Sequence, residues 1–180
     1  VGTMISSKGA ESQAIELYER ALHLADSSGN RSASAAVLRA LGNVYEKIRD
    51  TTKTLDYFQR ALRINEELGE QTELAANLNN LSGLLRAKGD FTRSLEYARR
   101  STAIRKAVDD VGGLPFSLRS LARTLAEMSK TDRLLFNEAV QTYREALEGF
   151  RRTRNNNGAA SVLNELARLY ARGTDLSQAA

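Results

Sequence analysis

Residues Leu38 to Leu62 read LRALGNVYEKIRDTTKTLDYFQRAL, and this stretch decides the fold. Its small and apolar residues form two runs, spaced i, i+3, i+4, i+7 in the first and i, i+3, i+6, i+7 in the second, and each run lies on one face of a helix. These residues are Leu38, Leu41, Gly42 and Tyr45 in the first run, and Leu55, Phe58, Ala61 and Leu62 in the second. One helical hairpin cannot bury both of its faces, so the stretch predicts neighbours of its own kind.

The same register recurs along the chain with a step of 40 residues, and of 45 at the last step. Small residues mark the first helices, at Gly2, Gly42, Ser82, Ala122 and Ala167. The second helices repeat as Ala14–Leu22, Thr54–Leu62, Ser94–Thr102 and Ala139–Leu147. The five additional residues therefore fall within Met128–Phe136, where we expect an enlarged turn.

Residues that tolerate a positive φ and end helices separate these segments. The sequence predicts breaks between repeats at Ser27–Asn30, Leu68-Gly69, Asp109–Pro115 and Asn155–Gly158. It predicts turns within repeats at Lys8-Gly9, Arg49-Asp50, Lys88–Asp90 and Gly173–Asp175. The array then consists of a partial repeat 1–29, full repeats 30–69, 70–110 and 111–157, and a partial repeat 158–180. Because both end repeats are cut, we expect the chain to be a fragment of a larger protein.

The stretch resembles the tetratricopeptide repeat (TPR), whose pattern is W-x2-L-G-x2-Y followed by A-x3-F. Leu38-x2-Leu41-Gly42-x2-Tyr45 follows this pattern with leucine in place of tryptophan, and Thr54-x3-Phe58 with threonine in place of alanine. The third repeat departs most, with Ser82, Ser94, Ala98 and Ser101 at small or aromatic positions. The resemblance implies an all-α fold, a right-handed α-solenoid of antiparallel helix pairs over residues 1–180.

The period of 40 residues is longer than the usual TPR unit of about 34. It is similar to the long-helix subclass found in kinesin light chains, in spindle adaptors that bind G proteins and in bacterial signalling arrays. The residues do not choose among these three groups.

The composition argues against an enzyme. The chain has no cysteine and one histidine, His23, so neither a thiolate nor a histidine metal cluster is available. Gly112-Gly113 lacks the remainder of a phosphate-loop motif, and we interpret it as a turn between repeats. We therefore expect no catalytic residues, no metal and no cofactor. The absence of cysteine and of long apolar runs favours a cytoplasmic protein that does not cross a membrane.

In stacked helix pairs, the first helices line a concave groove that binds partners. Removing the core positions leaves polar residues on each first helix. The predicted peptide-binding residues are Arg39, Asn43, Lys47, Asn79, Asn80, Arg86, Arg119, Arg123, Asn164 and Arg168. The same faces also carry Glu46, Gly83, Phe116, Ser120, Glu127, Glu165 and Arg172. Resemblance to TPR proteins implies that Asn43, Asn79 and Asn164 hold the main chain of an extended peptide.

Basic residues outnumber acidic ones on this face, so the sequence predicts a protein-interaction scaffold that binds an acidic peptide segment. Two alternatives stay open. A self-associating scaffold would stack through its open ends. A nucleic-acid-binding helical repeat would need aromatic residues for base stacking, and the predicted groove offers only Phe116.

Overall fold

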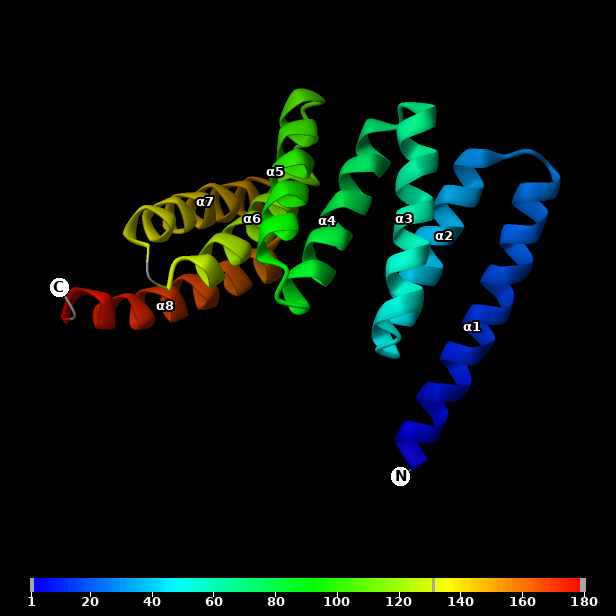
Figure 1. Cartoon of the computed structure of the whole chain (residues 1–180), viewed down its shortest axis with the longest axis horizontal. Helices are drawn as coiled ribbons and strands as arrows, with labels where there is room; N and C mark the ends of the chain where they lie inside the picture. Colours follow the sequence, from blue (N-terminus) through cyan, green and yellow to red (C-terminus); the bar gives the residue numbers. More distant parts are fainter. Residues whose placement is uncertain (1, 131, 179–180) are drawn as a thin grey trace. The chain divides into compact units, whose positions relative to one another are not determined.

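The computed structural model describes the backbone of residues 2–130 and 132–178, and the side chains of residues 9–130 and 132–172. These residues form eight helices and no strand (Figure 1). In chain order the helices are α1 (Gly2–Ser27), α2 (Arg31–Lys47), α3 (Thr51–Leu68), α4 (Gln71–Ala87), α5 (Phe91–Ala107), α6 (Leu114–Met128), α7 (Arg133–Arg152) and α8 (Asn156–Gln178).

Contacts divide the chain into an N-terminal unit, Val1–Asn77, and a C-terminal unit, Leu78–Ala180. In the N-terminal unit, α2 packs against both α1 and α3. In the C-terminal unit, α6 packs against α5, α7 and α8, and α7 also packs against α8. Within each unit these successive helices pair through short turns, and the predicted fold class, an all-α solenoid of antiparallel helix pairs, is confirmed.

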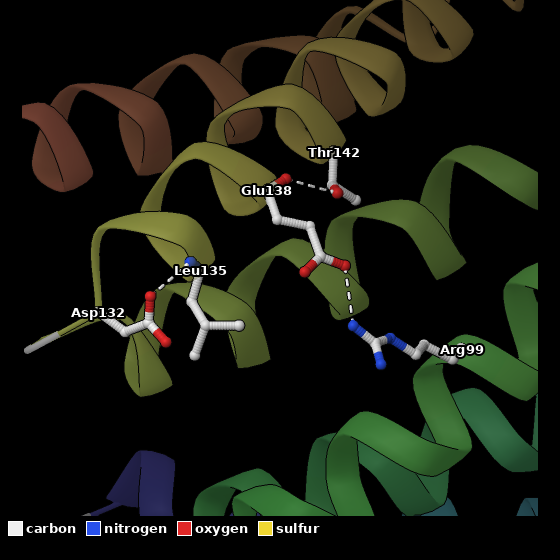
Figure 2. Close-up of polar contacts among 5 residues, drawn as sticks. All are labelled: Arg99, Asp132, Leu135, Glu138 and Thr142. Carbon is white, nitrogen blue, oxygen red and sulfur yellow. Dashed lines mark hydrogen bonds and ion pairs between the residues drawn. The ribbon is translucent and has the colours of Figure 1, made fainter.

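Aspartates cap the start of three helices. Asp50, Asp90 and Asp132 each accept a hydrogen bond from the backbone N–H three residues further on, at 3.0, 3.2 and 3.2 Å. Figure 2 shows the last of these bonds, from the N–H of Leu135 to Asp132. The caps satisfy backbone donors that the first turn of a helix leaves unpaired.

The helices end near the predicted breaks, at residues 28–30, 69–70, 108–113 and 153–155. Several of these turns require a positive φ. In the α2–α3 turn Arg49 has a φ of 64°, and Gly89 holds the equivalent position of the α4–α5 turn with a φ of 80°. An arginine therefore occupies a backbone conformation that favours glycine.

Two predicted turns are wrong. Helix α1 continues through Lys8-Gly9, and α8 continues through Gly173–Asp175. Gly9 is not among the residues with a positive φ. Glycine permits that conformation without imposing it, and glycine within a helix costs only about 1 kcal/mol relative to alanine.

The prediction of an enlarged turn within Met128–Phe136 is also wrong in its detail. The turn Ser129–Asp132 is one residue longer than Lys88–Asp90, and most of the insertion lengthens α7, which has 20 residues against 17 in α5. The cap at Asp132 starts α7 early. Phe136, in the first turns of α7, packs edge-to-face on Tyr170 with ring centroids 6.2 Å apart, which holds the added segment on α8.

Aromatic side chains fill the space left by glycines in neighbouring helices. Phe58 of α3 is fully buried, and a Cβ on Gly42 of α2 would lie 2.5 Å from its ring. Phe150 of α7 is also fully buried, and a Cβ on Gly158 of α8 would lie 2.4 Å from its ring. The small and the aromatic position of the second repeat, Gly42 and Phe58, therefore pack against each other, and Phe150 and Gly158 make a similar contact at other positions.

Buried hydroxyl groups replace this packing in the third repeat. Ser94 Oγ donates to the carbonyl oxygen of Ser82 at 2.9 Å and lies 2.9 Å from Thr124 Oγ1. Ser101 Oγ lies 2.6 Å from Ser117 Oγ. All five residues are fully buried, so hydrogen bonds between hydroxyl groups of the third and fourth repeats join α4, α5 and α6.

Exposed ion pairs join the second helices α5 and α7. Arg99 Nη2 lies 2.9 Å from Glu138 Oε1, and Lys106 Nζ lies 3.3 Å from Glu145 Oε2. Figure 2 shows the first pair and the bond from Thr142 Oγ1 to the carbonyl oxygen of Glu138. Pairs this exposed contribute at most about 1 kcal/mol each.

Candidate functional site

The C-terminal unit contains a polar pocket of about 150 Å³. Four helices line it, each with one to three side chains. The lining residues are Arg86 of α4, Arg123, Ala126 and Glu127 of α6, Tyr143 of α7, and Glu165, Arg168 and Arg172 of α8. We name this site the arginine pocket. Its four arginines and two glutamates leave a formal excess of two positive charges.

Ion pairs between α6 and α8 occupy part of the arginine pocket. Arg123 Nη2 lies 3.0 Å from Glu165 Oε1, and Glu165 is half-buried. Arg172 Nη1 lies 3.8 Å from Glu127 Oε1, at the long end of an ion pair. The second oxygen of Glu165 is buried and has no hydrogen-bond partner among the described residues. The glutamates thus balance only two of the four cations.

Arg86 is the most desolvated cation of the pocket. Burial lowers the pKa of its guanidinium, and the positive charge of Arg123 lowers it further. Its Nε is buried and has no hydrogen-bond partner among the described residues. Arginine stays protonated in proteins, so Arg86 remains a half-buried cation with an unused donor.

Tyr143 contributes the aromatic wall of the pocket. It is 3% exposed, and burial raises the pKa of its hydroxyl, as does the negative charge of Glu165. The hydroxyl therefore stays neutral and can donate or accept a hydrogen bond.

The structure brings together three of the ten predicted binding residues, Arg86, Arg123 and Arg168. Arg119 instead lies over two aromatic rings, 5.9 Å from the centroid of Phe116 and 5.7 Å from that of Phe150. That cation–π arrangement covers the core of the C-terminal unit, and Arg119 does not line the pocket.

The other predicted residues lie outside the arginine pocket. In the N-terminal unit, Arg39 Nη2 pairs with Glu73 Oε2 at 2.7 Å, and Lys47 is exposed on the last turn of α2. Asn164 is exposed on α8. The remaining three are half-buried: Asn43 on α2, and Asn79 and Asn80 on α4.

Comparison with known proteins identifies the family. The model of the tetratricopeptide repeat matches residues 8–67 and 34–107, which together span more than half of the chain. The chain belongs to the tetratricopeptide repeat family. A search of curated proteins finds no match.

Solved structures share the TPR fold. The nearly identical TPR-like repeats of a kinesin light chain from Podospora anserina superpose with a TM-score of 0.71 at 16% identity, covering 96% of this chain and 83% of theirs. A point variant of the same protein gives 0.73 with the same identity and coverage. BtubC (BKLC) of P. vanneervenii gives 0.54 at 22% identity, covering 92% of this chain and 59% of its own. These likenesses show the fold alone.

The sequence did not reveal the role of Tyr143. The TPR pattern assigns Tyr143 to the aromatic core position that Phe58 holds in the second repeat. The one available signal was the choice of tyrosine, because a buried hydroxyl needs a polar neighbour. Glu165, which provides that neighbour, comes from the next repeat.

The paired glycines 112 and 113 form a turn between α5 and α6, as predicted. The N–H of Gly113 donates to Asp110 Oδ1 at 2.8 Å, and Asp110 pairs with the buried Arg105 at 3.5 Å. A Cβ on Gly113 would lie 1.7 Å from Arg105 Nη1. Glycine therefore leaves room for the arginine in this TPR turn.

The part of the chain that the structure describes offers neither a membrane-spanning helix nor a metal-binding cluster. Within residues 2–130 and 132–178, no helix is long and apolar enough to cross a membrane. The same part of the chain holds no group of three or more His, Cys, Asp or Glu residues placed to bind a metal ion. His23 is exposed on α1.

Proposed function

We propose that this TPR chain is a protein-interaction scaffold that binds an acidic peptide segment, with the arginine pocket as the anchor for a carboxylate. The observation that carries the proposal is the convergence of Arg86, Arg123, Arg168 and Arg172 on one pocket. TPR proteins serve as interaction scaffolds, and arginine forks match the geometry of a carboxylate.

The charges of the pocket favour an anionic ligand. Arg123 and Arg172 already form ion pairs with glutamates. Arg86 and Arg168, which also line the pocket, form no ion pair with any residue that the structure describes. A carboxylate between them would complete the hydrogen bonding of the buried Arg86 Nε. A hydrogen bond to a charged group contributes about 1.5–3 kcal/mol, enough for a short motif to depend on it.

The proposal also includes expectations that come from the sequence. The peptide contacts are the ten predicted groove residues, and the repeat boundaries are 1–29, 30–69, 70–110, 111–157 and 158–180. The lack of cysteine favours a cytoplasmic location. The chain itself carries out no catalysis and requires no cofactor in this proposal.

An array of short synthetic peptides tests the proposal. Each acidic peptide is paired with a version in which Asn and Gln replace Asp and Glu. We expect the wild-type chain to capture acidic members and not their amide versions. The double substitution Arg86→Gln and Arg168→Gln should weaken capture about tenfold or more, because it removes two unpaired cations.

Arg99→Gln is the matched control, because Arg99 is an exposed arginine on the outer helix α5. It should leave capture unchanged, and melting temperatures should confirm that all variants fold. Equal capture of acidic and amide peptides would contradict the proposal, as would equal capture by the pocket variant and the wild type. Sedimentation across concentrations separates the rival, since a self-associating scaffold gains mass with concentration without any peptide.

A further inference from the structure

The C-terminal unit has a second pocket, of about 260 Å³, where the end of α5, the start of α6 and the last turns of α7 meet. It shares no lining residue with the arginine pocket. Its apolar wall consists of Val111, Leu114, Pro115 and Leu118, and Val111 is 41% exposed. We name this site the proline pocket. Small-molecule sites usually measure about 300–1,000 Å³, so the proline pocket is better matched to one apolar side chain of a partner.

Charged side chains form the rest of the proline pocket. They are Lys106, Asp109, Glu145, Glu148 and Arg152, and all five are exposed. Lys106 Nζ pairs with Glu145 Oε2 at 3.3 Å, so these two charges offset each other. Asp109, Glu148 and Arg152 form no ion pair with any residue that the structure describes. The pocket therefore has an excess of one negative charge, and two of its carboxylates are available to a ligand.

The N-terminal unit contains an equivalent pocket of about 240 Å³, in which Leu38 and Ile64 form the apolar wall. We name it the isoleucine pocket. Five charged residues complete its lining: Asp26, Arg31, Arg60, Arg63 and Glu67. Each of these seven residues corresponds, two repeats further along the chain, to a residue of the proline pocket. The two pockets are therefore the same site of the repeat, present once in each unit.

The charges of the two pockets are opposite. Four equivalent pairs reverse sign: Asp26 and Lys106, Arg60 and Glu145, Arg63 and Glu148, and Glu67 and Arg152. The fifth position changes from Arg31 to Val111. The helices around each pocket pack in the same order, α1 to α3 in one unit and α5 to α7 in the other. The fold therefore accepts either sign at these positions, and the sign is free to select a partner.

We propose that the proline pocket binds an apolar side chain of a partner protein, at a position flanked by lysine or arginine. The apolar side chain lies against Val111 and Leu114, and the flanking cations pair with Asp109 and Glu148. In the isoleucine pocket the same segment would meet Arg63 in place of Glu148, so charge directs it to the C-terminal unit. This site is separate from the arginine pocket and binds a segment of the opposite charge.

Three synthetic peptides of equal length test the inference. The first has a central leucine flanked by lysines, the second has glutamines in place of the lysines, and the third has serine in place of the leucine. We expect the wild-type chain to bind the first peptide about tenfold more tightly than either of the others, because only the first has both the apolar side chain and the matching charge. Fluorescence anisotropy of labelled peptides measures the three affinities.

The double substitution Val111→Arg and Glu148→Arg gives the proline pocket the residues of the isoleucine pocket at two positions, Arg31 and Arg63. It should fold, because the N-terminal unit has arginine at both equivalent positions, and melting temperatures check this. It should bind the lysine-flanked peptide about tenfold more weakly than the wild type. Glu96→Arg is the matched control, because Glu96 is an exposed glutamate of α5 outside the pocket, and it should leave the affinity unchanged.

A preference of the wild type for the lysine-flanked leucine peptide, lost in the double variant and kept in Glu96→Arg, supports the inference. Equal binding of that peptide by the double variant and the wild type would overturn it, as would equal binding of the leucine and serine peptides or no binding at all. A mass that rises with concentration in the wild type alone would also overturn it, because the occupant would then be the oppositely charged isoleucine pocket of a second copy. Failure of the basic peptide leaves the proposed function standing, because that function is tested with acidic peptides at a pocket that shares no residue with this one.

Discussion

Tyr143 connects the arginine pocket to the core of the C-terminal unit. Burial and the charge of Glu165 raise the pKa of its hydroxyl above the ordinary value of about 10. Above about pH 10 the unfolded chain loses this proton while the folded chain keeps it. The folded state then binds more protons, so the free energy of unfolding decreases as the pH rises.

We expect Tyr143→Phe to remove part of that decrease, up to about 1.4 kcal/mol per pH unit. Denaturant unfolding of the wild type and the variant at about pH 8 and about pH 11 measures the difference. The free energy of unfolding should fall further between the two pH values for the wild type than for the variant. At the lower pH the two proteins should differ less. An identical loss of stability in both proteins would show that the Tyr143 proton has no part in it.

The buried hydroxyl groups around Ser94 are expected to matter for stability. Ser94→Ala removes a group that bonds to both Ser82 and Thr124, so it should lower the free energy of unfolding by about 1–3 kcal/mol. Ser161→Ala is the control, because its hydrogen bond to the Asn157 carbonyl is exposed, and it should change stability by less than about 0.5 kcal/mol. Equal effects of the two substitutions would contradict a structural role for the buried hydroxyls.

Periodicity identified which residues lie on the first helices, but it could not identify their partners. Arg86, Arg123 and Arg168 were predicted to bind a peptide, and they meet in one pocket. Arg119 lies one helical turn before Arg123 on the same helix, yet it lies over Phe150. The partner of Arg123, Glu165, comes from the next repeat, and that of Arg119 comes from the second helix of its own repeat. The identity of each partner therefore depends on packing that a spacing rule does not contain.

At the scale of a single turn, Arg49 occupies a conformation with a positive φ. The equivalent residue of the α4–α5 turn is Gly89, which takes that conformation without steric strain. We expect Arg49→Gly to raise the free energy of unfolding by about 1 kcal/mol. Thermal melting of Arg49→Gly beside Arg49→Ala checks this expectation, and a gain seen equally in both variants would rule out relief of backbone strain as its cause.

Helices and their breaks were predictable where a repeat is followed by another repeat. The break at Gly69 and the turn at Gly89 each combine a glycine with a new amphipathic period after it. Gly9 and Gly173 carry the same residue type, but α1 and α8 continue through them. Glycine is therefore a reliable sign of a turn only when the residues on both sides have packing that requires one.

On the scale of the whole molecule, the register of the repeats was sufficient to predict the family and the fold class. It repeats small and aromatic residues at fixed spacing, and these residues pack against one another, as Gly42 does with Phe58. The function was less predictable because the polar residues that we propose as ligand contacts are not part of the repeat pattern. Our proposal of an acidic partner rests on the charge of these residues, three of which line the arginine pocket.

The central claim is that the arginine pocket binds the carboxylate of a peptide. Its most direct test follows the arginine Nε–H signals by nuclear magnetic resonance while an acidic peptide selected on the array is titrated into the wild-type chain. The claim predicts saturable shifts of the Arg86 and Arg168 signals, no shift of the Arg99 signal, and no response to the matched amide peptide. Saturable peptide binding that leaves the Arg86 and Arg168 signals unmoved would contradict it.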